Sequence, residues 1–233
     1  MTYEFLGGNL ALDFTNTLHS HGESDPGDDL KTAADLVEWA AQTGLLRDKD
    51  THKLGRTHAD QARFRRALAL RELLYEIFSR AATGKRPQPQ AVRNFQSFYQ
   101  NAIRHAEFHP VADHYRLMWP ASTCPLERIS QEIARSAAEL LTSEALTRVR
   151  QCSGESCSWL FVDNSRNGMR RWCDMKACGN REKVRRFRRN LRRSVGKSSG
   201  AEDDFGETRR PLDVKVRGKR FNRKLLAIRT HRP

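Results

Sequence analysis

The stretch Cys152-Ser-Gly-Glu-Ser-Cys157, followed after fifteen residues by Cys173-Asp-Met-Lys-Ala-Cys178, decides the fold of the C-terminal part of this 233-residue chain. Two close cysteine pairs separated by a short span suit tetrahedral Zn²⁺, because each pair chelates from a tight turn and the span supplies a hairpin. Histidine cannot contribute locally, since none occurs between His114 and His231. The spacing therefore predicts one structural zinc ion bound by four cysteines.

Two alternatives stay open for these cysteines: four unrelated buried or redox-active thiols, and disulfides. The N-terminal residues 1–8 lack the basic and apolar segments of a secretory signal, so we expect a cytoplasmic protein whose thiols stay reduced. Reduced thiols at such regular spacing favour the metal site. The fifth cysteine, Cys124, is expected to be a thiol of the hydrophobic core.

The segments around the cysteines indicate the order of a treble-clef-like zinc finger. Trp159–Val162 has the composition of a strand and Asn164–Gly168 that of a turn, while Met169–Trp172 is predicted to return as a second strand. A helix then starts at Cys178, where the positive end of the helix dipole favours a thiolate. Nearby cations are expected to balance the negative charge of the site. They are Arg170, Arg171, Lys176 and Arg181.

A strongly basic helix follows the last cysteine. Val184, Phe187 and Leu191 recur at helical spacing and form a narrow apolar seam. We expect this seam to pack on aromatic residues of the finger while the arginines face outward. The aromatic candidates are Trp159, Phe161 and Trp172. If these rings are exposed they favour stacking on single-stranded RNA, and if they lie beneath the helix they favour duplex DNA.

The basic side chains of this helix are the candidate nucleic-acid contacts, because the guanidinium fork of arginine pairs well with phosphates and guanine edges. A helix braced by zinc predicts a nucleic acid as the partner, whereas a basic run that serves only solubility is the simpler alternative. Asn180 and Arg181 either reach base edges or only turn the chain around the zinc. The candidate DNA-binding residues are Asn180, Arg181, Lys183, Arg185, Arg186, Arg188, Arg189 and Arg192.

The charge distribution supports a polyanionic partner. The formal net charge is +14, but residues 1–150 contain 19 basic and 19 acidic side chains. Residues 151–193 contain 12 basic and 4 acidic side chains, and residues 194–233 contain 11 and 5. A neutral body with a basic end indicates a module with an appendage that binds polyanions. No stretch approaches the roughly 18 uninterrupted apolar residues of a membrane span.

The first 150 residues read as a mainly α-helical domain of the α+β class. Asn9 is a predicted N-cap for a first helix, 19–30 has loop composition, and 114–119 suggests a short strand. This first helix is expected over 10–18, and further helices are expected over 32–46, 58–82, 90–104 and 126–141. Beyond the basic helix we expect a flexible linker at Ser194–Gly200 and a disordered basic tail to residue 233.

Two groups of polar residues near the N-terminus are candidate binding sites. Asn9, Asp13, Asn16 and Thr17 border the apolar stripe of the first helix, where they either bind a small polar ligand or satisfy the backbone. A second metal site in the following loop is the other candidate, and a flexible acidic loop is its alternative. Its residues are His19, His21, Glu23, Asp25 and Asp28.

Several motifs resemble two bacterial families. The CGNR zinc finger family is similar to this chain at Cys152-x4-Cys157, Trp159–Asp163, Ser165-Arg-Asn167, Arg171–Met175 and Cys178-Gly-Asn-Arg181 with Lys183. The ABATE stress-induced transcription regulator domain, which precedes this finger, is similar at Leu6-Gly-Gly8, Leu12–Thr17, Leu36–Trp39 and Gly44-Leu45. The resemblance covers about residues 3–193.

The resemblance implies a cytoplasmic, zinc-dependent transcription regulator whose finger binds DNA and whose N-terminal domain senses a small molecule. It divides the chain into an ABATE-like domain at 1–150, a CGNR-type finger with its basic helix at 151–193, and a tail at 194–233. Family members end soon after the arginine helix, whereas 40 residues follow here. An RNA-binding or ribosome-associated zinc protein is the alternative function.

We do not expect an enzyme. Nucleases built on treble clefs use histidine beside the metal, and this finger contains none. The chain also lacks a glycine-rich phosphate loop and a nucleophile motif.

Overall fold

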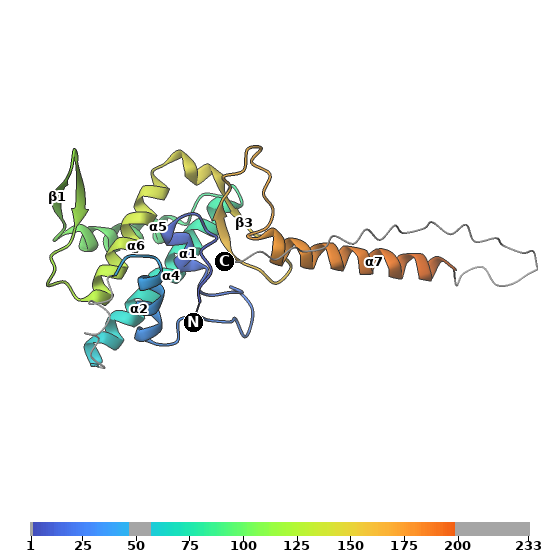
Figure 1. The fold of residues 1–233 in the computed structure, drawn as a ribbon, viewed down its shortest axis with the longest axis horizontal. Coiled ribbons are helices and arrows are strands. Elements are labelled where there is room, and N and C mark those ends of the chain that lie inside the picture. Colours follow the sequence, from blue (N-terminus) through green and yellow to red (C-terminus); the bar gives the residue numbers. More distant parts are fainter. Residues whose placement is uncertain (1, 47–56, 199–233) are drawn as a thin grey trace, which may run out of the picture. The chain divides into compact units, whose positions relative to one another are not determined.

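The computed structural model describes residues 2–46 and 57–198, with side chains described as far as residue 192. The described residues up to Asn190 form one compact unit. None of the described helices has the length and apolarity needed to cross a membrane. The elements are α1 (Leu10–Thr15), α2 (Ala33–Gln42), α4 (His58–Ala82), α5 (Pro89–Ile103), β1 (Glu107–Val111), β2 (His114–Met118), α6 (Pro125–Leu141), η1 (Glu144–Arg148), β3 (Val149–Gln151), β4 (Leu160–Val162), η2 (Met175–Gly179) and α7 (Asn180–Ser198) (Figure 1).

Short-range sequence signals explain where the helices begin. At α2 the Thr32 hydroxyl accepts from the backbone N–H of Asp35, whose carboxylate accepts from the backbone N–H of Thr32, and α4 begins with the same capping box. Helices α5 and α6 begin instead with a proline in the first turn. The helices predicted over 32–46, 58–82, 90–104 and 126–141 are confirmed as α2, α4, α5 and α6.

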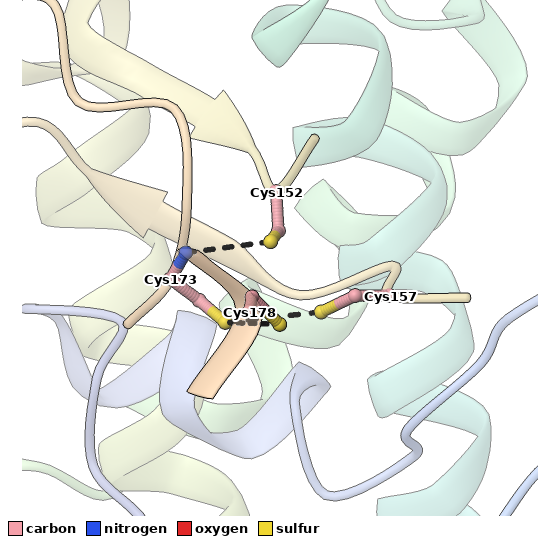
Figure 2. Close-up of side chains that lie close together, drawn as sticks. All are labelled: Cys152, Cys157, Cys173 and Cys178. Carbon is pink, nitrogen blue, oxygen red and sulfur yellow. Dashed lines mark hydrogen bonds between the residues drawn. The ribbon is translucent and has the colours of Figure 1, made fainter. Parts of the chain in front are cut away.

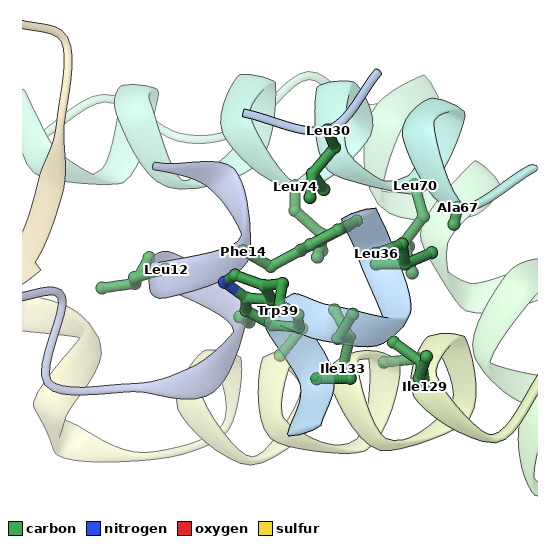
Figure 3. Packing of buried hydrophobic residues seen from close by; sticks show 14 of the residues in the cluster. Leu12, Phe14, Leu30, Leu36, Trp39, Ala67, Leu70, Leu74, Ile129 and Ile133 are labelled. Atoms are coloured by element: carbon green, nitrogen blue, oxygen red, sulfur yellow. The ribbon is translucent and has the colours of Figure 1, made fainter. Parts of the chain in front are cut away.

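The hydrophobic core lies between these helices. The short helix α1 packs against both α4 and α6, and α5 packs along α6. Figure 3 shows Phe14 of α1 beside Trp39 of α2, with ring centroids 5.4 Å apart, and Leu74 and Ile133 close by. An isolated six-residue helix is not stable in water, because helix nucleation is unfavourable. Burial in the core therefore holds α1 in place.

One sheet is a hairpin outside this core. The strand predicted at 114–119 is confirmed as β2, and its partner β1 was not predicted. The two strands pair from Glu107 opposite Met118 to Val111 opposite His114. Most side chains of both strands are exposed, so β1 has no alternating hydrophobic pattern that would reveal it.

The second sheet belongs to the finger, and it differs from the expected one. Strand β4 pairs with β3, so the turn of this hairpin contains the first cysteine pair. Residues 169–172 do not form the second strand that was predicted to pair with β4. The buried carboxylate of Asp163 explains this difference. It accepts from the hydroxyl and backbone N–H of Ser165 and from the backbone N–H of Arg170, which curls this segment into a turn.

The basic helix also differs from expectation at its end. Helix α7 continues to Ser198, through most of the segment predicted as a flexible linker. Serine, glycine and lysine tolerate a helix that is already nucleated, so composition alone misplaced its end. The disordered tail predicted beyond it lies outside the described residues, since 199–233 are not described.

The finger and the helical domain share one core. Val149, Leu160 and Val162 of the finger strands are buried in the same cluster as the helices. The outer edge of β4 is completed by the N-terminal segment rather than by a third strand. The Asn16 side chain accepts from the Leu160 N–H at 2.8 Å and donates to the Leu160 carbonyl at 2.9 Å, and the Gly7 carbonyl accepts from the Val162 N–H at 2.8 Å.

A buried carboxylate holds Gly7 in position for this contact. The Asp13 side chain accepts from the Gly7 N–H at 2.7 Å. Burial raises the pKa of Asp13 to about 6, although the hydrogen bond from Gly7 opposes this rise. A Cβ atom at Gly7 would lie 2.9 Å from the Leu12 Cβ, so only glycine fits this close approach.

Replacing Asn16 with leucine is expected to lower the free energy of unfolding by about 2–4 kcal/mol, because both backbone groups of Leu160 lose their partner in a buried site. Urea unfolding of the zinc-loaded chain measures this loss. The control is Asn94→Leu on α5, whose side chain is exposed and accepts from the side chain of Gln90. Equal losses in the two variants would contradict the proposed importance of the contact with β4.

Candidate metal centre and nucleic-acid interface

Four cysteine sulfurs meet at one point of the finger. Cys152 follows β3, Cys157 closes the turn before β4, Cys173 lies in the loop before η2, and Cys178 lies within η2. Figure 2 shows their side chains pointing toward one another, and their sulfur atoms all lie within 4.8 Å. The sulfur of Cys173 lies 3.8 Å from that of Cys157 and 3.6 Å from that of Cys178.

This geometry fits one structural zinc ion. Tetrahedral Zn–S bonds of about 2.3 Å place sulfurs roughly 3.8 Å apart, which is close to the spacings of the cluster. Three of the four cysteines are buried, and all five cysteines of the chain are free thiols, so disulfides are excluded. The predicted ligand set is therefore brought together as one site. Cys124 packs against the core of the helical domain, as expected.

Hydrogen bonds to the sulfur of Cys152 favour its thiolate form, which is the form that binds a metal cation. The pKa of Cys152 is held well below its usual value, because the Cys157 and Cys173 thiols donate to its sulfur, as do the backbone N–H groups of Cys173 and Gly154. The pKa values of Cys157 and Cys173 are raised, because they hold protons shared with that thiolate. Four thiolates at this spacing would repel one another strongly. A divalent cation removes that repulsion.

Two aspartates that the sequence analysis did not single out shape the loops of the site. Asp174 caps η2, since its carboxylate accepts from the backbone N–H groups of Lys176 at 3.1 Å and Ala177 at 3.0 Å. This cap orients the turn that contains Cys178. Asp163 organises the loop that leads to Cys173. An aspartate two or three residues before the groups that it caps is a recognisable signal for both turns.

Of the four cations expected to balance the thiolates, Arg181 contacts a sulfur. Its guanidinium donates to the sulfur of Cys178 at 3.1 Å, and this contact raises the pKa of Arg181. Arg170 instead donates to the carbonyls of Leu6, Trp172 and Cys173 and lies over the ring of Phe161 at 4.2 Å. Arg170 therefore ties the finger to the N-terminal segment.

The cations of α7 fall into two groups. Arg185 pairs with Glu155 and Glu182, and Arg189 pairs with Glu182 at 3.5 Å. Asn180, which carries no charge, donates to the Lys176 carbonyl, and this bond supports its role in turning the chain around the cluster.

The second group contains the remaining predicted DNA-binding residues, which are exposed and have no ion-pair partner within residues 2–46 and 57–192. They are Lys183, Arg186, Arg188 and Arg192.

The apolar seam of α7 does not pack on the finger, and the expectation that it would is wrong. Val184 is 50% exposed, Phe187 67% and Leu191 56%. The aromatic residues expected beneath it face the cysteines instead: Trp159 and Phe161 are buried in the sulfur cluster, with Trp172 packed against them. The burial of Trp159 and Phe161 leaves these two rings unavailable for stacking on bases.

The polar strip of the N-terminal segment is used within the protein. Asn9 caps α1, and Asp13 and Asn16 position Gly7 and β4 as described above. The Thr17 hydroxyl donates to the Phe14 carbonyl and accepts from Arg71. Ligand binding by these four residues stays a prediction, and their hydrogen bonds match the alternative in which they serve the backbone.

The loop after α1 is held in place by the helical domain. The buried guanidinium of Arg71 binds both oxygens of Asp28 at 2.7 and 2.8 Å. His19 lies 2.9 Å from Asp29, while the His21 ring stacks on Tyr75 with centroids 3.4 Å apart. Within the described part of the chain, only the four cysteines form a cluster suited to a metal, so the second metal site is not formed.

Replacing Arg181 with methionine is expected to weaken zinc binding by about 10–100-fold, the range seen when a neighbour of a metal ligand is lost. Competition of the full chain with a chromophoric chelator measures the affinity. Lys183→Met removes a nearby cation that touches no sulfur, and its zinc affinity should match that of the unchanged chain. If both variants bind zinc equally weakly, the general positive charge rather than the Arg181 contact stabilises the site.

The chain matches two family models. Residues 8–144 match ABATE, described as a putative stress-induced transcription regulator, and residues 148–190 match the CGNR zinc finger. A search of curated proteins found no match. The ABATE match spans more than half of the chain, and the CGNR match contains all four clustered cysteines. The protein therefore belongs to the ABATE family and contains a CGNR zinc finger that suits one structural zinc ion.

Proposed function

We propose that this protein is a transcription regulator that binds duplex DNA through α7 and acts by binding rather than by catalysis. The single observation that carries the proposal is the row of exposed cations on α7 without acidic partners in the described residues. Cations left unpaired in this way are available to phosphates. An α-helix with its side chains is about as wide as the major groove of B-DNA, about 12 Å.

The finger stabilises the start of α7, which a short basic helix could not do by itself. A helix of this composition gains little from its own packing, and like charges along it oppose its formation. The contact of Arg181 with Cys178 and the cap of Asp174 on η2 tie the start of α7 to the zinc cluster. The burial of Trp159 and Phe161 favours duplex DNA over single-stranded RNA as the partner, because these rings cannot stack on bases.

The two groups of cations predict different salt responses. The logarithm of the DNA affinity should fall with the logarithm of salt, and Arg188→Gln should reduce the slope by about 0.9, the value of one phosphate contact. Arg185→Gln should change the slope less, because Glu155 and Glu182 already neutralise Arg185 and repel phosphate. Fluorescence anisotropy of a labelled 20-base-pair duplex over a salt series measures both slopes.

The same assay separates DNA from RNA. Unlabelled duplex DNA should displace the labelled duplex at lower concentrations than a structured RNA of equal length. If RNA competes better, the protein is an RNA-binding zinc protein. A salt-independent affinity would show that α7 is not the DNA-binding element, and identical slopes for Arg188→Gln and the unchanged chain would show that Arg188 makes no phosphate contact.

We also propose that the helical domain senses a small acidic molecule, in a cavity rather than at the polar strip. A cavity of about 210 Å³ lies between α4, α5 and α6. Arg66 lines it, Phe98 and Leu126 supply apolar surface, and the buried Oε1 of Gln131 has no hydrogen-bond partner in the described chain. These groups suit a small aromatic acid that carries one hydrogen-bond donor.

The aromatic acid 4-hydroxybenzoate is a suitable probe for this cavity. Arg66→Gln should weaken its binding by about 10–100-fold, the value of a hydrogen bond to a charged group. Arg65→Gln, the adjacent exposed arginine outside the cavity, should leave binding unchanged. Isothermal titration calorimetry of the zinc-loaded chain measures both affinities. Equal affinities in the two variants, or no binding to the unchanged chain, would contradict this location.

A further inference from the structure

Phosphate binding explains the cations of α7 but not the exposed apolar side chains on one face of this helix. Val184 and Phe187 are half or more exposed on a helix in which ten of the nineteen residues are charged. Water-exposed apolar side chains at consecutive turns cost free energy, and the finger does not cover them. Apolar surface arranged in this way marks a face that is buried in a complex.

The cations lie on both flanks of this face. Each residue of an α-helix advances by about 100°, so Lys183 and Arg186, which directly precede Val184 and Phe187, lie on one side. Arg188, which directly follows Phe187, lies on the other side. The acidic side chain of this segment, Glu182, lies on the opposite face of the helix, where it binds Arg185 and Arg189.

We propose that Val184 and Phe187 contact thymine methyl groups in the major groove, so that α7 prefers A·T-rich duplex DNA. The proposal rests on the DNA-binding function proposed above. The C5-methyl group of thymine is the apolar group that base pairs present in the major groove. A helix whose apolar face points at the base edges directs Lys183 and Arg186 to one phosphate strand and Arg188 to the other.

The charge of the flanking residues and the width of the apolar face favour duplex DNA over a second copy of α7 and over an anionic membrane. A second copy of α7 would bring its own flanking cations against these cations, and like charges at close range repel. An anionic membrane accepts basic amphipathic helices, but their apolar face is broad and rich in large side chains. Here the apolar face is one side chain wide. Arginine also predominates over lysine among the flanking cations, and its planar fork pairs well with phosphate.

Substitution of thymine by deoxyuridine tests the proposal, because it removes only the methyl groups. The zinc-loaded full chain is titrated into two 20-base-pair A·T duplexes of the same sequence, one with thymine and one with deoxyuridine, at one salt concentration. The thymine duplex should bind about 4-fold more tightly for each methyl group that is buried, the value of burying one CH₂ group.

Substitutions in α7 test whether this helix causes the preference for thymine over deoxyuridine. Phe187→Ser and Val184→Thr should reduce the ratio between the two duplexes while the salt slope stays the same. The matched control is Phe108→Ser on β1, since Phe108 is 75% exposed and lies on the hairpin, and it should keep the full ratio. Because both phenylalanines are exposed, neither substitution should unfold the chain. The zinc content of each variant checks this.

Three other outcomes would contradict the proposal, each in a different way. If both duplexes bind equally tightly to the unchanged chain, the thymine contact is wrong and the DNA-binding function stands. If neither duplex binds, the DNA-binding function itself fails. If Phe187→Ser instead abolishes binding to vesicles containing anionic phosphatidylserine and leaves both duplex affinities unchanged, the apolar face binds membranes and the proposal is overturned.

Discussion

The pairing of the Asn16 amide with both backbone groups of Leu160 is the contact on which the arrangement of the finger depends. A segment of the finger's size cannot bury enough apolar surface to fold on its own without metal or a partner domain. Strand β4 obtains hydrogen bonds from β3 on one edge and from Gly7 and Asn16 on the other. The helical domain therefore supplies part of the finger's sheet as well as part of its core.

Contacts within the finger hold several basic residues of the chain in place. Arg181 contacts Cys178, and Arg170 binds three carbonyl oxygens of the neighbouring loops. Arg185 and Arg189 are held by acidic side chains. The net charge of the basic end thus overstates the positive charge available to a partner, because several of its cations stabilise the finger instead.

The helical domain and the finger are in direct contact, which gives the proposed sensing function a physical route to the zinc site. Helix α4 lines the cavity through Arg66 and packs against β3. Tyr75 on the same helix stacks on His21 and accepts from the side chain of Gln151, the residue before Cys152. A ligand that shifts α4 would therefore act on residues next to a zinc ligand without an intervening linker.

The sequence by itself determined the zinc ligands, the helices of the core and the basic nature of α7, because cysteine spacing, capping residues and hydrophobic periodicity are local signals. Only the tertiary structure decided which strand pairs with β4, since Asp163 turns residues 163–170 away from the expected hairpin. It also decided that Asn16 serves the finger and that Phe187 stays exposed. The pairing of Asn16 with Leu160 joins residues far apart in the chain, and no local pattern encodes such partners.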